Sequence, residues 1–154
     1  MGFSVSGATA LLFVAFLISF GTFYTATMGA VEQVQEAEVD AQEQNLEALN
    51  TDIQIQSTEY NASGQDELMI VANNTGAEPL QPTSLSLLVN GTFTAFGQGN
   101  VSITESSQNE LWAPQQQLTI TLSNGDVPTP ASGETVKLVT KTAVAATAQI
   151  TVVN

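Results

Sequence analysis

Residues 8–24 read ATALLFVAFLISFGTFY and are apolar on every face of a helix. They lie within residues 1–31, a segment that contains no charged side chain. A bilayer core about 30 Å thick needs about 20 apolar residues in a helix, and residues 3–26 supply that length. We therefore expect residues 1–30 to form one transmembrane helix that anchors the rest of the chain.

A cleaved secretory signal peptide is the alternative for this segment. Such peptides combine a basic n-region with an apolar core of about 7–15 residues. This segment has no basic residue and a longer apolar run, although Thr25-Ala26-Thr27 could serve as a small-residue cleavage site. We expect an uncleaved anchor.

Three small residues of the apolar segment share one helical face. Gly21, Thr25 and Gly29 follow one another at intervals of four residues. Small residues at this spacing let two membrane helices approach closely, so this face is a candidate helix-packing surface. The competing interpretation, which the abundance of Gly and Thr in membrane helices favours, is that the spacing is incidental.

The charge balance of the chain is strongly acidic. Its 154 residues include 15 acidic side chains and only two basic ones, Lys137 and Lys141, for a net charge of −13. Nucleic-acid binding is disfavoured because it requires basic residues that neutralise phosphates. The acidic balance is typical of proteins from hypersaline environments. Since the chain has neither Cys nor His, disulfides, Cys-based zinc sites and His-based general bases are excluded.

An acidic segment follows the apolar one. Residues 31–50 read VEQVQEAEVDAQEQNLEALN, with good helix formers throughout and no Gly or Pro. We expect the helix to continue to about Leu49 as a solvated stalk, which makes it about 70 Å long at about 1.5 Å per residue. Glu38 and Asn45 interrupt the apolar stripe of this segment, so it makes a poor coiled-coil seam. A packing helix inside an assembly remains the alternative.

From Thr51 onward, the pattern changes from helical to alternating, as in Asp52-Ile53-Gln54-Ile55-Gln56. We expect an extracytoplasmic domain over residues 51–154, an all-β sandwich of immunoglobulin-like type with about seven to nine short strands. Turns are predicted at Tyr60–Gly64, Asn73–Pro79 and Asn90-Gly91. The expected strands are 52–56, 68–72, 84–89, 92–96, 101–104, 118–122, 135–140 and 145–153.

Two features of this domain have alternative interpretations. Trp112 is the only tryptophan, and we expect it in the core rather than exposed for a partner. The run from Ala143 to Val153 is uncharged and β-prone. Burial as a core strand is favoured, but an open sheet edge could instead pair with a partner or form a homodimer by strand addition.

No cluster of residues indicates catalysis. The chain has no nucleophile–base pair with His or Cys, no phosphate loop and no zinc motif. Asp66-Glu67 is a carboxylate pair that could bind calcium, but solvated loop acids are the favoured interpretation. We therefore expect no enzyme activity, no cofactor and no metal, and a structural or binding role.

Four Asn-x-Ser/Thr sequons indicate N-glycosylation, and therefore an exported surface. Because no basic residue flanks the apolar segment, the positive-inside rule does not set its orientation. The sequons place the N-terminus inside the cell and the bulk of the chain outside. They begin at Asn61, Asn73, Asn90 and Asn100.

Several segments together resemble the haloarchaeal archaellum accessory protein family FlaF (ArlF): MGFSVSGATALLFV, ISFGTFYTA, NTDIQI, LWAPQQQLTI and ETVKLVTKTAVAATA. The resemblance covers nearly the whole chain. It implies a single-pass anchor in the cell membrane with an immunoglobulin-like sandwich in the archaeal pseudoperiplasm. It also implies that the sandwich binds the surface-layer protein, self-associates, and acts with a FlaG-type partner as a stator of the archaellum motor.

Archaellins and archaeal type IV pilins share the broad layout of an apolar helix and a β-rich head. They carry Lys or Arg and then Gly ahead of the apolar run, whereas here only Met1 precedes Gly2. This difference favours a permanent anchor over a processed filament subunit. A third hypothesis, an exported sandwich that binds a solute or glycan, predicts a concave site that no residue cluster indicates.

Overall fold

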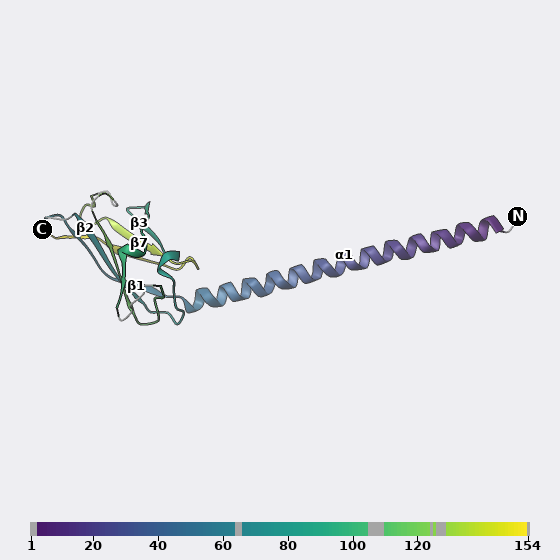
Figure 1. The fold of residues 1–154 in the computed structure, drawn as a ribbon, viewed down its shortest axis with the longest axis horizontal. Coiled ribbons are helices and arrows are strands. Elements are labelled where there is room, and N and C mark those ends of the chain that lie inside the picture. Colours follow the sequence, from purple (N-terminus) through teal and green to yellow (C-terminus); the bar gives the residue numbers. More distant parts are fainter. Residues whose placement is uncertain (1–2, 64–65, 105–109, 124, 126–128, 154) are drawn as a thin grey trace. The chain divides into compact units, whose positions relative to one another are not determined.

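The computed structural model describes residues 3–63, 66–104, 110–123, 125 and 129–153. The chain divides into two compact units, Met1–Glu43 and Gln44–Asn154. Figure 1 shows both units, and each is described by itself below. We call the second unit the head.

One uninterrupted helix, α1, spans Phe3–Asn50. This confirms the prediction that the apolar segment and the acidic segment share a single helix. Hydroxyl groups within the apolar segment bond to the helix's own backbone: Ser19 Oγ donates to Ala15 O at 2.8 Å and Thr27 Oγ1 donates to Phe23 O at 2.8 Å. The polar side chains of this segment are thereby satisfied without water.

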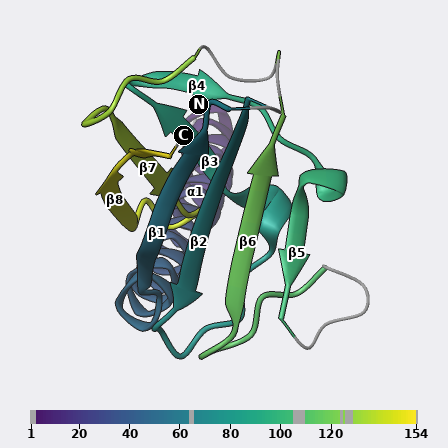
Figure 2. The ribbon, with the colours of Figure 1, turned by 90° about the vertical axis from the view of Figure 1, so that its left-hand side faces the viewer.

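The head is a sandwich of two sheets, which confirms the predicted fold class. One sheet has the order β5-β6-β2-β1-β9 and the other has the order β4-β3-β7-β8. Figure 2 shows β1, β2 and β6 side by side in front of β3, β7 and β8. The strands are β1 Ile53–Asn61, β2 Glu67–Asn74, β3 Ser86–Val89, β4 Thr92–Thr94, β5 Val101–Ile103, β6 Gln117–Leu122, β7 Thr135–Val139, β8 Ala145–Gln149 and β9 Thr151–Val153, with short 3-10 helices η1 Pro82–Ser84 and η2 Gln98–Asn100.

Alternation along the strands builds the core. In β2, Leu68, Ile70 and Ala72 point inward and are buried, whereas the residues between them are partly or fully exposed. Trp112 is completely buried in the same core, which confirms its predicted core position. Its indole Nε1 donates to Gln116 O at 2.8 Å, so the one polar atom of the ring is also satisfied.

The first two strands are longer than the sequence pattern predicts. Tyr60 was expected in a turn, but it lies in β1, opposite Leu68 of β2 and beside Val152 of β9, and its side chain is buried. Similarly, the loop that was predicted to begin at Asn73 begins two residues later, because Asn74 is the last residue of β2. In each case a side chain with a polar group, Tyr60 or Asn74, is buried, and the strand pairing continues through that residue.

The C-terminal run differs from both the predicted single strand and its predicted burial. It is divided at Ile150, which is buried. The residues before it form β8, the last strand of the four-stranded sheet, and those after it form β9, which pairs in parallel with β1 in the other sheet. No residue of β8 is buried. The expectation of a core strand is therefore wrong: this run forms two edge strands, since a peripheral strand packs only its inner face.

Candidate functional site

Backbone hydrogen bonds hold the junction where α1 ends and β1 begins. Only Thr51 and Asp52 separate the two elements. The carbonyl oxygen of Asn50 accepts hydrogen bonds from the backbone amides of Ala77 at 2.8 Å and Glu78 at 3.2 Å. The last carbonyls of a helix lack partners within it, and here the loop after β2 supplies them. The end of α1 is therefore attached to the head by more than the covalent chain.

Asp52 continues this attachment on the other side of the same loop. Its backbone oxygen accepts from the amides of Thr75 at 3.0 Å and Gly76 at 2.9 Å, and its carboxylate accepts from Thr75 Oγ1 at 2.8 Å. Gly76 is required by space: a Cβ there would lie 2.5 Å from Asn50 O and 2.5 Å from Asp52 N. The close approach of two backbones explains why this position has no side chain.

A buried amide side chain holds the loop that makes these contacts. Asn74 is completely buried. Its Nδ2 donates to Glu78 O at 2.8 Å and Trp112 O at 3.1 Å, and its Oδ1 accepts from Gly76 N at 3.1 Å. A buried amide is tolerated when its hydrogen bonds are made, and these three connect the core tryptophan segment to the junction loop.

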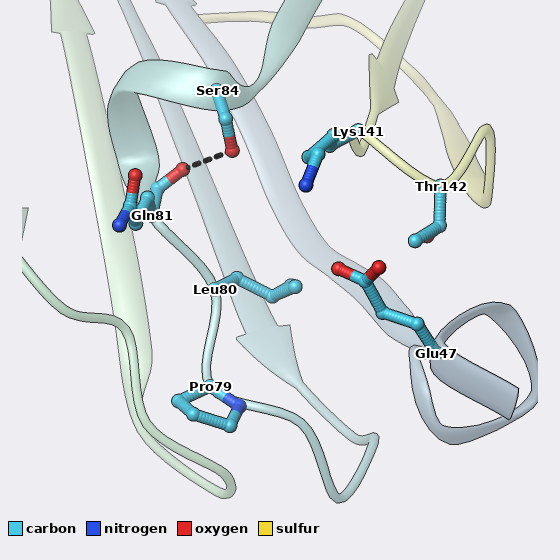
Figure 3. Close-up of a pocket in the computed structure, with 7 residues that line it drawn as sticks. All are labelled: Glu47, Pro79, Leu80, Gln81, Ser84, Lys141 and Thr142. Atoms are coloured by element: carbon cyan, nitrogen blue, oxygen red, sulfur yellow. Dashed lines mark hydrogen bonds between the residues drawn. The ribbon is translucent and has the colours of Figure 1, made fainter. Parts of the chain in front are cut away.

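A small hollow of about 170 Å³ lies beside the junction, as Figure 3 shows. The end of α1 contributes Glu47 and the turn between β7 and β8 contributes Lys141 and Thr142. The remaining walls come from the segment around η1. Its lining residues are Glu47, Pro79, Leu80, Gln81, Ser84, Lys141 and Thr142.

The turn that carries Lys141 is firmly built. Thr140 is buried, its backbone N donates to Val144 O at 2.8 Å, and its Oγ1 bonds Thr142 Oγ1 at 2.9 Å. A second hollow of about 550 Å³ shares Glu47, Lys141 and Thr142 with the first. The lining of both hollows therefore combines one carboxylate, one ammonium group and uncharged side chains.

The expected helix-packing face is open in the structure. No described atom lies within 4 Å of the position that a Cβ would take on Gly21 or Gly29. Thr25 is exposed, and its Oγ1 donates to Gly21 O at 3.2 Å and Thr22 O at 3.0 Å. The single chain therefore brings these three residues onto one accessible face but places nothing against it, and their packing role stays a prediction.

The four sequons divide into two kinds. Asn61 and Asn90 are exposed, whereas Asn73 and Asn100 are half-buried within or beside strands of the larger sheet. Sequence pattern alone does not separate these pairs, because all four satisfy the same motif. The structure therefore shows a difference in exposure between sequons that share the same motif.

Asp66 has a structural partner. Tyr60 Oη donates to Asp66 Oδ1 at 3.1 Å. Burial raises the pKa of the Tyr60 hydroxyl, and the hydrogen bond to Asp66 raises it further. Within the described residues, no group of three or more acidic side chains is placed to hold a metal ion.

Sequence reasoning missed the junction. It assigned Asn74 and Gly76 to an ordinary loop, and it gave no role to the pair of Glu47 and Lys141. One signal for Asn74 was available: it continues the inward phase of Leu68, Ile70 and Ala72, so a polar residue stands where the pattern calls for an apolar one. No signal indicated that Lys141 lies beside the end of α1, because that proximity depends on the sheet topology.

Comparison with known proteins places the chain in a family. The sequence model of archaeal-type flagellin matches residues 2–151, nearly the entire chain. The chain belongs to the archaeal-type flagellin family. Its resemblance to archaellum proteins is confirmed at this level. Membership connects the chain to the archaellum and to motility. No curated protein sequence matches this family member.

Several solved structures share the sandwich of this archaeal-type flagellin. The archaellum periplasmic stator protein FlaG from Sulfolobus acidocaldarius is 16% identical, with a TM-score of 0.46, and the match covers 64% of this chain and 98% of that one. The complex of FlaF and FlaG from the same organism gives 15% identity and 0.44 over 63% and 86%. A chain in the structure of the human cytomegalovirus protein US2 bound to the MHC class I molecule HLA-A2 gives 12% identity and a TM-score of 0.41 over 66% of this chain and 98% of that one. At these values the likeness concerns the fold alone.

Helix α1 meets the length and composition needed to cross a membrane. Its candidate span has a mean hydropathy of 1.8 and is 0% buried by other described parts of the chain. An apolar helix without a covering layer in its own chain needs lipid or other helices around it.

Proposed function

We propose that this protein is a single-pass membrane component of the archaellum motor whose head lies in the pseudoperiplasm and binds the surface-layer protein as part of the stator. The observation that carries the proposal is the junction at Asn50. An apolar helix that suits a membrane continues without a break into a helix end that the head holds by backbone hydrogen bonds. A stator must resist torque between two fixed structures, and hydrogen bonds that hold the end of its stalk helix within the head serve that purpose.

A binding role rather than a catalytic one is part of the proposal. Within the described residues, the two hollows at Glu47 and Lys141 bring together one carboxylate and one ammonium group but no His or Cys. A rigid head with open sheet edges is better suited to protein partners, including a FlaG-type archaellum protein and a second copy of the chain.

A filament subunit is the second candidate, and the family match over residues 2–151 favours it. In such a filament, helices from many copies pack side by side. Here the helix carries six acidic residues between Glu32 and Glu47 and no basic one. Side-by-side packing of this segment would bring like charges on neighbouring helices together, and like charges repel one another. This charge pattern supports a solvated stalk over a filament core.

Two insertions of equal length test the stiff connection. Seven Gly/Ser residues inserted after Gln42 would make the stalk flexible, whereas seven Ala/Glu/Lys residues inserted there would lengthen the same helix. We expect cells that carry the flexible insertion to assemble filaments but to swim poorly, and cells that carry the helical insertion to keep most of their motility. Equal motility of the two strains would contradict the stator proposal.

Copy number separates the two candidates. Quantitative mass spectrometry of purified filaments and of washed membranes would locate the chain. A stator component stays in the membrane fraction at a few copies per filament base, whereas a subunit is abundant in the filament. Abundance in purified filaments would replace the stator proposal with the second candidate.

A further inference from the structure

The four sequons differ in whether their full three-residue motif is accessible. In Asn61-Ala62-Ser63 and Asn90-Gly91-Thr92, all three residues are exposed. In the other two motifs, the middle residue is buried: Asn74 follows Asn73, and Val101 follows Asn100. A transferase must bind all three residues of the motif, because it recognises the hydroxyl group two residues after the asparagine. Exposure of the middle residue therefore distinguishes acceptors from non-acceptors in the folded head.

Asn61 has the side-chain geometry of an available acceptor. Its Oδ1 accepts hydrogen bonds from Ser63 N at 3.0 Å and from Ser63 Oγ at 3.1 Å. This is an Asx turn, in which the asparagine side chain folds toward the residue two positions on. The turn occupies the carbonyl end of the amide and brings the Ser63 hydroxyl beside it. Among the described residues, none accepts a hydrogen bond from Asn61 Nδ2.

Asn90 is accessible at a hairpin tip. It has a φ of 49° and is followed by Gly91 with a φ of 79°, the positive values that a tight hairpin turn requires. Its Nδ2 donates to Glu134 Oε1 at 3.1 Å, and both groups are on the surface. An amide nitrogen that carries a sugar keeps one proton, so this contact is compatible with modification.

The remaining two asparagines are half-buried. Asn100 uses both ends of its amide: Nδ2 donates to Thr121 O at 3.0 Å and Oδ1 accepts from Gly97 N at 3.1 Å. Asn73 lies in β2, which has β1 on one side and β6 on the other. A transferase would have to pull this strand from the middle of the sheet and expose the buried Asn74.

We propose that Asn61 and Asn90 carry N-linked glycans and that Asn73 and Asn100 do not. The donor is a lipid-linked oligosaccharide attached through a phosphate group. Nδ2 of the asparagine forms a bond to the anomeric carbon, and the bond from that carbon to the phosphate oxygen breaks. The lipid phosphate leaves with the electron pair, and one amide proton passes to a base of the transferase.

Both acceptors lie at the end of the sandwich opposite Asn50. β1 starts beside Asn50 and ends at Asn61, where it pairs with Val153 of β9. β3 starts just after η1, near the Glu47 recess, and ends beside Asn90, whose backbone N donates to Thr135 O at 2.8 Å. Glycans at these positions would coat the far end of the head and leave the junction and its recess uncovered.

Glycopeptide mass spectrometry of the full-length chain from the membranes of its own cells tests the proposal. We expect oligosaccharide on the peptides that contain Asn61 and Asn90, and unmodified peptides for Asn73 and Asn100. The variant Ser63→Ala should lose the Asn61 glycan although it keeps the asparagine, and Ser63→Thr should retain it. An unmodified Asn61, or a glycan on Asn73 or Asn100, would overturn the proposal.

This inference rests on the proposed location of the head outside the membrane, so that location needs its own measurement. A membrane-impermeant amine reagent applied to intact cells should label Lys137 and Lys141, the only lysines of the chain. A labelled head without glycans would overturn the glycan proposal alone. A head that is neither labelled nor glycosylated would overturn the stator proposal as well.

Discussion

The apolar segment of α1 and the inner faces of the head use the same kinds of residue with opposite outcomes. In α1, Leu17 is 54% exposed and Ile18 is 63% exposed. In the head, Leu68 and Ile70 are completely buried. The head covers its apolar side chains with a second sheet, whereas the apolar side chains of α1 named above are exposed in the described part of the chain.

Periodicity explains this difference. Inward residues in β2 recur every second position, so one strand has an apolar face and a polar face, and two such sheets can bury their apolar faces together. In residues 8–24 the apolar residues are consecutive and surround the helix. A helix that is apolar on all sides needs a surrounding apolar medium. The same kinds of side chain therefore form a core within the head, whereas in α1 they require a surrounding apolar medium.

The largest expected effect comes from removing the centre of the head's core. Trp112→Ala deletes a completely buried ring and its hydrogen bond to Gln116 O. We expect the free energy of unfolding to fall by about 3–5 kcal/mol. Denaturant unfolding of the full-length chain in detergent micelles, followed by the β-sheet circular dichroism signal, measures the change.

The neighbouring residue is the control. Leu111 is 51% exposed, and we expect Leu111→Ala to change the free energy of unfolding by no more than about 0.5 kcal/mol. Similar losses of unfolding free energy in the two variants would contradict the prediction that the buried side chain contributes more to stability than the exposed one.

The medium around α1 can be tested with one substitution in the apolar segment and one in the acidic segment. Leu17 and Val34 are similarly exposed in the structure, at 54% and 59%, but only Leu17 lies in the uncharged segment. Leu17→Arg should weaken membrane insertion by about 2.5–3.5 kcal/mol, the cost of Arg at the centre of a membrane helix. Val34→Arg should leave insertion unchanged. The fraction of full-length protein that resists alkaline extraction from membranes measures both, and equal retention would contradict a lipid environment for Leu17.

The elements that the sequence predicted correctly are those with local causes. Helix formers without Gly or Pro carry α1 to Asn50, and strict alternation marks Leu68 to Ala72 as a buried strand. The elements that it missed depend on distant partners. Parallel pairing with β9 extends β1 past Tyr60, and the change of sheet at Ile150 divides the C-terminal run. Likewise, the junction depends on Gly76 meeting Asn50, a contact between segments that no local pattern connects.

The junction where α1 enters the head offers a third test. Gly76→Ala places a Cβ 2.5 Å from the backbone oxygen of Asn50, and the backbone cannot yield without losing the hydrogen bonds from Thr75 and Gly76 to Asp52. We expect a loss of about 1–3 kcal/mol in the free energy of unfolding. Gly99→Ala is the matched control, because nothing lies within 4 Å of its added Cβ. Since Trp112 is the only tryptophan, its fluorescence reports unfolding of the head in both variants.

The smallest expected effect concerns pH and one hydroxyl group in the head. Burial raises the pKa of Tyr60, and the hydrogen bond to Asp66 adds to this shift. A raised pKa means that the folded state favours the protonated hydroxyl more than the unfolded state does. The resulting stabilisation is therefore fully present below the unfolded pKa of about 10 and is lost as the pH rises above it. Unfolding of the full-length chain, followed by Trp112 fluorescence across the alkaline range, should show a stability that falls above about pH 10, and Tyr60→Phe should flatten that fall. If the free energy of unfolding falls equally with pH in Tyr60→Phe and in the unchanged protein, a group other than the Tyr60 hydroxyl causes the fall.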